Sequence, residues 1–131
     1  MDSNTKYPVV KLSELNEESW NSFELGFRAL CFKNKCLLPL HLDQPVLPDP
    51  ADPALAAAEA KLLDWQTQNM TIHFLLCGVV ATAPLKAQHI VNKHRASPGD
   101  VNPDGMPNDN GRAAYQTSRV AANLHRQSCS S

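Results

Sequence analysis

The sequence predicts an all-α protein, a small bundle of four to five helices with proline-rich connectors. Apolar residues recur at the 3.6-residue period of a helix in several segments. Most of the ten prolines stand between those segments or at their starts. No two alternating apolar runs flank a tight turn, as a β-hairpin would require. The 131 residues, 43% of them hydrophobic and 19% charged, suit one folded domain rather than a disordered chain.

The first helix is expected over residues 17–34. Residues 1–8 precede it as a polar lead that we expect to be flexible, and a single helical domain is expected to span 9–126. Residues 13–16 contain side chains that favour a helix N-cap. Acidic residues in the first turn and lysines near the last turn suit the helix dipole. Apolar residues at helical spacing form one stripe on this helix: Trp20, Phe23, Phe27, Leu30 and Cys31.

A connector follows over residues 36–53, and the second helix is expected over 54–81. The connector holds half of the ten prolines, so we expect neither a helix nor a central strand there. Asp52 and Pro53 predict an N-cap followed by proline at the first helical position. Five alanines over residues 54–60 favour the helix, which has a possible break near Asn69 or Gly78.

Two further helices complete the expected bundle. A short helix is predicted after Pro84 and ends near Lys93, with Leu85 and Ile90 facing inward and His89 as a further candidate for that face. Residues 95–110 are rich in turn formers and predict an exposed loop. Asp109 or Asn110 is expected to cap a last helix over 111–126, and residues 127–131 are expected to be a frayed tail.

The charge is unevenly distributed, although the net charge is only −1. Residues 1–64 carry six bases against ten acids, a net charge of −4, and residues 65–131 carry six bases against three acids, a net charge of +3. This asymmetry either favours head-to-tail contacts between copies or is ordinary surface scatter. The N-terminal residues do not resemble a signal peptide, and no apolar run reaches membrane length. We therefore expect a cytoplasmic protein with reduced thiols and no membrane contact.

Basic residues of the second half are candidates for a contact with a polyanion such as RNA. They are Lys86, Lys93, Arg95, Arg112, Arg119 and Arg126. Grooves that bind single-stranded nucleic acid interleave such residues with aromatic side chains, and here only Tyr115 stands among them. A solvated helix face is therefore the simpler interpretation.

One segment matches the opening of a calcium-binding loop. Asp100, Asn102, Asp104 and Gly105 stand at positions 1, 3, 5 and 6 of the pattern. Position 12 is Gly111, where calcium needs the bidentate carboxylate of a glutamate. Without that ligand we expect a solvated turn rather than a calcium site.

Enzymatic chemistry is not expected. His73 and Cys77 lie four residues apart on one helix, a spacing that can hold a metal, but two ligands do not make a site. We expect His73 to be a partly buried surface residue. Cys31 and Cys77 fall beside apolar helical positions, where a thiol behaves as a small hydrophobe. The chain has no phosphate loop, dinucleotide fingerprint or nucleophile elbow, so we expect no cofactor.

Three pieces of the sequence resemble the Gag polyprotein of copia-type long-terminal-repeat retrotransposons. The first piece is Leu12 and the stripe from Trp20 to Leu30, followed by Lys33-Asn34-Lys35-Cys36-Leu37-Leu38. The second is Trp65 with the aliphatic residues that follow it. The third is Asn110-Gly111-Arg112-Ala113-Ala114-Tyr115, which resembles the family's "G-R-A-A-aromatic" helix start. Together the pieces cover about residues 9–124 in the family's order.

The resemblance implies a helical capsid domain with a structural function. Such a domain associates with itself into a particle that packages the RNA of the element. Trp20, Leu30 and Trp65 would then anchor packing between the first and second helices. The alternatives are a helical adaptor module with no retroelement role and, less favoured, a calcium-binding or enzymatic domain. The residues implied as core are Leu12, Trp20, Phe23, Phe27, Leu30, Leu37, Trp65, Ile72 and Leu76.

Overall fold

The structure, a computed structural model, describes residues 10–130, with side chains described as far as Leu124. The expected lead at 1–8 lies outside the described residues. Within them the chain forms five helices and no strand, so the predicted all-α class is confirmed. The helices are α1 (Glu17–Lys33), α2 (Leu38–His41), α3 (Leu55–Val79), α4 (Leu85–Lys93) and α5 (Gly111–Ser130).

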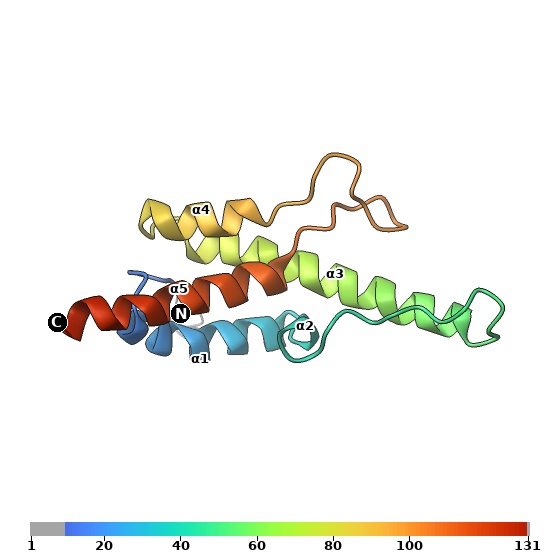
Figure 1. The fold of residues 1–131 in the computed structure, drawn as a ribbon, viewed down its shortest axis with the longest axis horizontal. Coiled ribbons are helices and arrows are strands. Elements are labelled where there is room, and N and C mark those ends of the chain that lie inside the picture. Colours follow the sequence, from blue (N-terminus) through green and yellow to red (C-terminus); the bar gives the residue numbers. More distant parts are fainter. Residues whose placement is uncertain (1–9, 131) are drawn as a thin grey trace, which may run out of the picture.

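The last helix, α5, is the central element of the bundle. It packs against each of the four other helices, with α1 on one side and α3 and α4 on the other (Figure 1). The resemblance implied that the first two long helices, α1 and α3, pack mainly against each other. In the structure each of them packs mainly against α5 instead. Trp20 of α1 instead lies against Tyr115 of α5, with 5.3 Å between the ring centroids.

Local side-chain and backbone bonds set both ends of α1. The Asn16 Oδ1 accepts a hydrogen bond from the backbone N–H of Ser19 at 2.8 Å, so Asn16 is the N-cap among the candidate residues 13–16. At the other end Lys35 adopts a positive φ of 57°. The Lys35 N–H donates to Phe32 O at 3.0 Å and the Cys36 N–H to Cys31 O at 2.9 Å. This Schellman arrangement ends the helix.

The connector departs from the prediction because it contains a helix. The single turn of α2 has Pro39 in its first turn, where a missing N–H costs no intrahelical bond. Pro39 is buried, so this turn lies on the core.

The second long helix is continuous, with no break at Asn69 or Gly78. It begins at Leu55, one residue after the expected start, and its N-cap is Ala54 rather than Asp52. The Asp52 Oδ1 accepts from the Ala54 N–H at 2.8 Å, within the turn that precedes the helix. At the far end the Leu12 N–H donates to Val79 O at 3.1 Å and binds one of the last helical carbonyls.

The inward face of α4 differs from the predicted one. Leu85 is 68% exposed and His89 is exposed, whereas Ala87 and Val91 are buried and Ile90 is partly buried. The smaller Ala87 permits a closer approach to α3 and α5 than a leucine would. Packing against two helices therefore decided the face of this nine-residue helix.

The last helix begins where the sequence predicts but ends later than expected. Asn110 caps α5, because its Oδ1 accepts from the Ala113 N–H at 3.0 Å. The helix then continues to Ser130, four residues beyond the predicted end at 126. The expected tail is therefore helical through Ser130, and residue 131 lies outside the described part.

Candidate functional site

The start of α5 rests directly on the backbone of α3. A Cβ atom on Gly111 would lie 2.4 Å from the His73 backbone nitrogen and 2.5 Å from the Asn69 carbonyl oxygen. Real Cβ atoms do not approach backbone atoms so closely. Glycine is therefore the residue that permits the two helices to touch at this point.

A buried asparagine of α3 completes the cap of α5. The Asn69 Oδ1 accepts from the Arg112 N–H at 2.7 Å, and its Nδ2 donates to the Asn110 Oδ1 at 3.2 Å. The first N–H groups of a helix have no intrahelical acceptor, so these bonds satisfy groups that would otherwise be buried without partners. Asn69 thereby fixes the register of α5 on α3.

The Arg112 side chain holds the connector to the same point. Its Nε donates to Pro39 O at 2.8 Å, and its Nη2 lies 2.5 Å from the Asp43 carboxylate. This internal role corrects the sequence interpretation, which grouped Arg112 with residues available to a polyanion. Asp43 is largely exposed, so the carbonyl bond is the more enclosed of the two contacts.

Tyr115 extends the contact to α1. Its ring stacks on Phe27 with a centroid distance of 5.8 Å and an interplanar angle of 19°. Its hydroxyl donates a hydrogen bond to the Glu24 carboxylate. Burial raises the pKa of Tyr115, and the bond to Glu24 raises it further. We call Asn110, Gly111, Arg112 and Tyr115, together with Asn69, the α5 junction.

The nine implied core residues lie inside or at the edge of the bundle. Leu30 and Leu37 are partly buried and pack against the core. Trp65 is buried, and its Nε1 donates to Leu42 O at 2.9 Å, so it packs on the connector rather than toward Trp20. The other six are buried: Leu12, Trp20, Phe23, Phe27, Ile72 and Leu76.

The remaining basic candidates lie on the surface or beyond the described side chains. Arg126 belongs to the latter. The exposed ones are Lys86 and Lys93 of α4, Arg95 after it, and Arg119 of α5.

The geometry of the calcium-like segment is that of a closed turn. The Asn102 Oδ1 accepts from the N–H groups of Asp104 and Met106, at 2.9 and 3.0 Å. The Asp100 Oδ1 accepts from the Asn108 Nδ2 at 3.0 Å. The Asn102 Oδ1 and the Asp100 Oδ1, two oxygens that calcium would need, thus accept hydrogen bonds from donors of the chain itself. In the part of the chain that the structure describes, no three His, Cys, Asp or Glu side chains are grouped to hold a metal.

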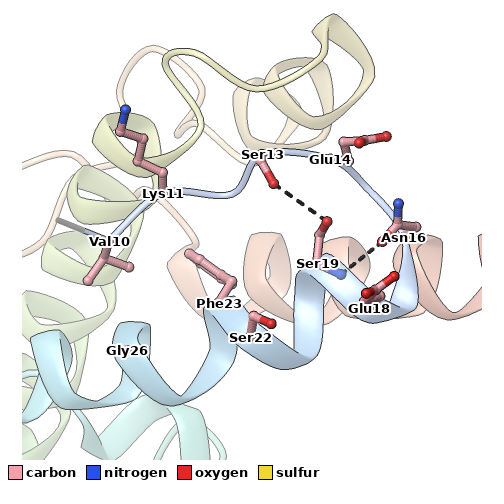
Figure 2. A pocket seen from close by; sticks show the side chains of 10 residues that line it. All are labelled: Val10, Lys11, Ser13, Glu14, Asn16, Glu18, Ser19, Ser22, Phe23 and Gly26. Atoms are coloured by element: carbon pink, nitrogen blue, oxygen red, sulfur yellow. Dashed lines mark hydrogen bonds between the residues drawn. The ribbon is translucent and has the colours of Figure 1, made fainter. Parts of the chain in front are cut away.

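A cavity of about 520 Å³ separates the segment before α1 from that helix. Figure 2 shows the Ser13 and Ser19 side chains directed toward each other, whereas the side chains of Lys11 and Glu14 point away from them. Ser13 donates to Ser19 at 3.5 Å, and the Ser19 N–H donates to Asn16. Val10 lies over Gly26. Its Cγ2 atom is 3.5 Å from the position that a Cβ on Gly26 would take, which is an ordinary contact distance. The hydrogen-bonded polar groups of this cavity, those of Ser13, Asn16 and Ser19, therefore lie at the N-cap of α1.

An apolar stripe on the outer face of α1 was missed in the sequence interpretation. Leu25 is 79% exposed and Phe32 is 72% exposed, with the exposed Ala29 between them. The three residues are spaced i, i+4 and i+7 and so share one face. The inner stripe from Trp20 to Cys31 has the same period, and only tertiary packing distinguishes the two.

No protein-family model, curated protein or solved structure matches this chain. Among the described residues, no helix combines the length and apolar character needed to cross a membrane.

Proposed function

We propose that this chain is a non-enzymatic structural domain, similar to the capsid region of copia-type Gag proteins, that associates with itself in the cytoplasm. The observation that carries the proposal is the α5 junction. Tyr115 of the third resembling piece packs on Trp20 and Phe27 of the first, and Gly111 packs on the helix that contains the second. The three pieces thus act as one fold-specifying unit, which supports the family resemblance.

The outer stripe of α1 is the surface we propose for self-association. Covering an exposed leucine or phenylalanine contributes roughly 1.5–3 kcal/mol. The positively charged α4, with Lys86 and Lys93 and no acid, lies on the opposite side of α5 from α1 (Figure 1). Because the first half of the chain carries the negative charge, head-to-tail contacts between copies are electrostatically favoured.

Light scattering over a rising protein concentration tests the proposal. We expect the average mass to grow with concentration, and Phe32→Glu to raise the midpoint concentration at least tenfold, since tenfold corresponds to about 1.4 kcal/mol. Val46→Glu is the matched control, because Val46 is 90% exposed but lies in the connector. A chain that stays monomeric at several hundred micromolar would overturn self-association and favour the adaptor function.

In the proposed particle, RNA would meet the surface cations rather than Arg112. Lys93, Arg95 and Arg119 are exposed and can approach phosphates, whereas Arg112 is bonded to Pro39. A contact made by so few charges is expected to be weak and to fall steeply with salt.

A further inference from the structure

A second cavity, also of about 520 Å³, lies between α3 and the loop before α5. Its wall is mainly apolar, with Met70 and Phe74 on the helix and Met106 and Pro107 on the loop. Phe74 is 75% exposed and Met106 is 45% exposed, so the cavity opens to solvent. Five polar or ionisable side chains also line it: Thr71, His73, Cys77, Arg95 and Asp109.

Cys77 stands beside a histidine whose ring is fixed. The Cys77 sulfur lies 3.7 Å from His73 Nδ1, one helical turn away. On the other side of the ring, His73 Nε2 lies 2.8 Å from Val91 O. A carbonyl only accepts, so Nε2 carries the hydrogen and Nδ1 of the neutral ring is the acceptor that faces the thiol. His73 is 2% exposed, against the expectation of a partly buried surface residue.

Two charged groups complete the surroundings of this pair. The Asp109 Oδ2 lies 3.9 Å from His73 Nδ1. Burial raises the pKa of the Cys77 thiol and Asp109 raises it too, whereas the Arg95 guanidinium lowers it. The thiol is therefore protonated at rest and needs a base to react.

We propose that Cys77 is a thiol-exchange site for small disulfides that combine an apolar body with a carboxylate. The apolar wall would receive the body, and Arg95 would attract the carboxylate. His73 takes the thiol proton, the Cys77 sulfur attacks one sulfur of the disulfide, and the disulfide bond breaks. The proton passes to the departing thiolate, so Cys77 is oxidised to a mixed disulfide while one small thiol is released.

This site goes beyond the proposed function and does not depend on it, because none of its residues belongs to the outer stripe of α1. It also distinguishes Cys77 from two other cysteines. Cys31 and Cys36 are 0% and 1% exposed and lack a route to such a reagent.

Reaction with 5,5′-dithiobis(2-nitrobenzoate), a small aromatic disulfide with carboxylates, tests the site. A Cys129→Ser chain is used, because the side chain of Cys129 lies outside the described part. At pH 7 we expect one equivalent of thiol release, assigned to Cys77 by peptide mass spectrometry, at least tenfold faster than at Cys77 in the urea-unfolded chain. His73→Gln is expected to remove this acceleration. A native rate no faster than the unfolded rate would overturn the proposal.

A second comparison remains decisive if His73→Gln disturbs the fold. Arg95→Gln is expected to slow the anionic probe several-fold but not the neutral 4,4′-dithiodipyridine. Lys93→Gln is the matched control, since Lys93 is an exposed cation two residues away that does not line the cavity. Equal rates for the Arg95 and Lys93 variants with both probes would contradict the assigned role of Arg95.

Discussion

At the scale of single residues, Gly111 and Asn69 make the contact between α3 and α5 possible. Gly111 contributes by having no side chain, because any Cβ would overlap the α3 backbone. Asn69 contributes a side chain whose oxygen and nitrogen both bond to the first turn of α5 or its cap. A substitution at either position acts on the placement of a whole helix.

Gly111→Ala is expected to destabilise the fold by roughly 3 kcal/mol, since overpacking against backbone cannot be relieved by a side-chain rotation. Gly78→Ala is the matched control, because a Cβ there meets nothing within 4 Å. Near the end of α3 the control should gain up to about 1 kcal/mol from helix propensity. Urea denaturation monitored by circular dichroism measures both. Equal stabilities of the two variants would show that the α3 and α5 backbones separate readily.

At the scale of elements, the interface between α1 and α5 is aromatic, with one polar bond inside it. Ring contacts at centroid distances between 5.0 and 5.8 Å connect four aromatic residues: Trp20, Phe23, Phe27 and Tyr115. The Tyr115 hydroxyl reaches Glu24 at the edge of this cluster. The interface thus combines apolar burial with a bond that depends on the protonation of Tyr115.

This bond predicts a loss of stability at alkaline pH. The pKa of Tyr115 is raised above its ordinary value of 10.0, so the folded state keeps the proton that the unfolded state releases. The stabilisation is complete below pH 10 and decreases above it, by up to about 1.4 kcal/mol per pH unit. Tyr115→Phe removes this contribution and should show a shallower decline in urea melts between pH 9 and 11. Lysines titrate in both chains, so identical slopes would exclude Tyr115 as the cause.

At the scale of the whole molecule, the fold depends on its C-terminal helix. Because α5 packs against every other helix, the bundle cannot close until this last segment is in place. Three of its hydrogen bonds to the rest of the chain span 43, 73 and 91 residues, at Asn69, Pro39 and Glu24. These contacts couple the packing of the other described helices to the placement of α5.

A chain that ends after Asn110 is therefore expected to lose its tertiary structure, although α1 and α3 are long helices. Near-ultraviolet circular dichroism should lose the signal of the packed Trp20 ring, and thermal unfolding should become non-cooperative. A chain that ends after Leu124 is the control, because it retains the buried residues Ala114, Tyr115, Ser118 and Ala122. A cooperative transition in the shorter chain would contradict a central role for α5.

The class, the approximate positions of the four longer helices and the short segments that hold the N-caps of α1 and α5 follow from the sequence alone. These features are local: apolar spacing, proline positions and bonds between a side chain and a backbone group three residues away determine them. Apolar spacing also singled out the stripe of α1 that is buried, but the same spacing in Leu25, Ala29 and Phe32 marks a face that stays exposed. The resemblance to Gag singled out Gly111, Arg112 and Tyr115 but not what each one contacts.

Only the folded structure shows which helix is central, which face of α4 is buried, that Pro39 lies in a helical turn, and that Arg112 bonds to a carbonyl. It also placed His73 and Cys77 beside Arg95 and Asp109, which come from beyond α4. The contacts responsible join segments far apart in the chain, and a side chain leaves no periodic mark of a partner 43 to 91 residues away. Local bonding therefore specifies the helices, whereas steric fit at a few close contacts specifies how they assemble.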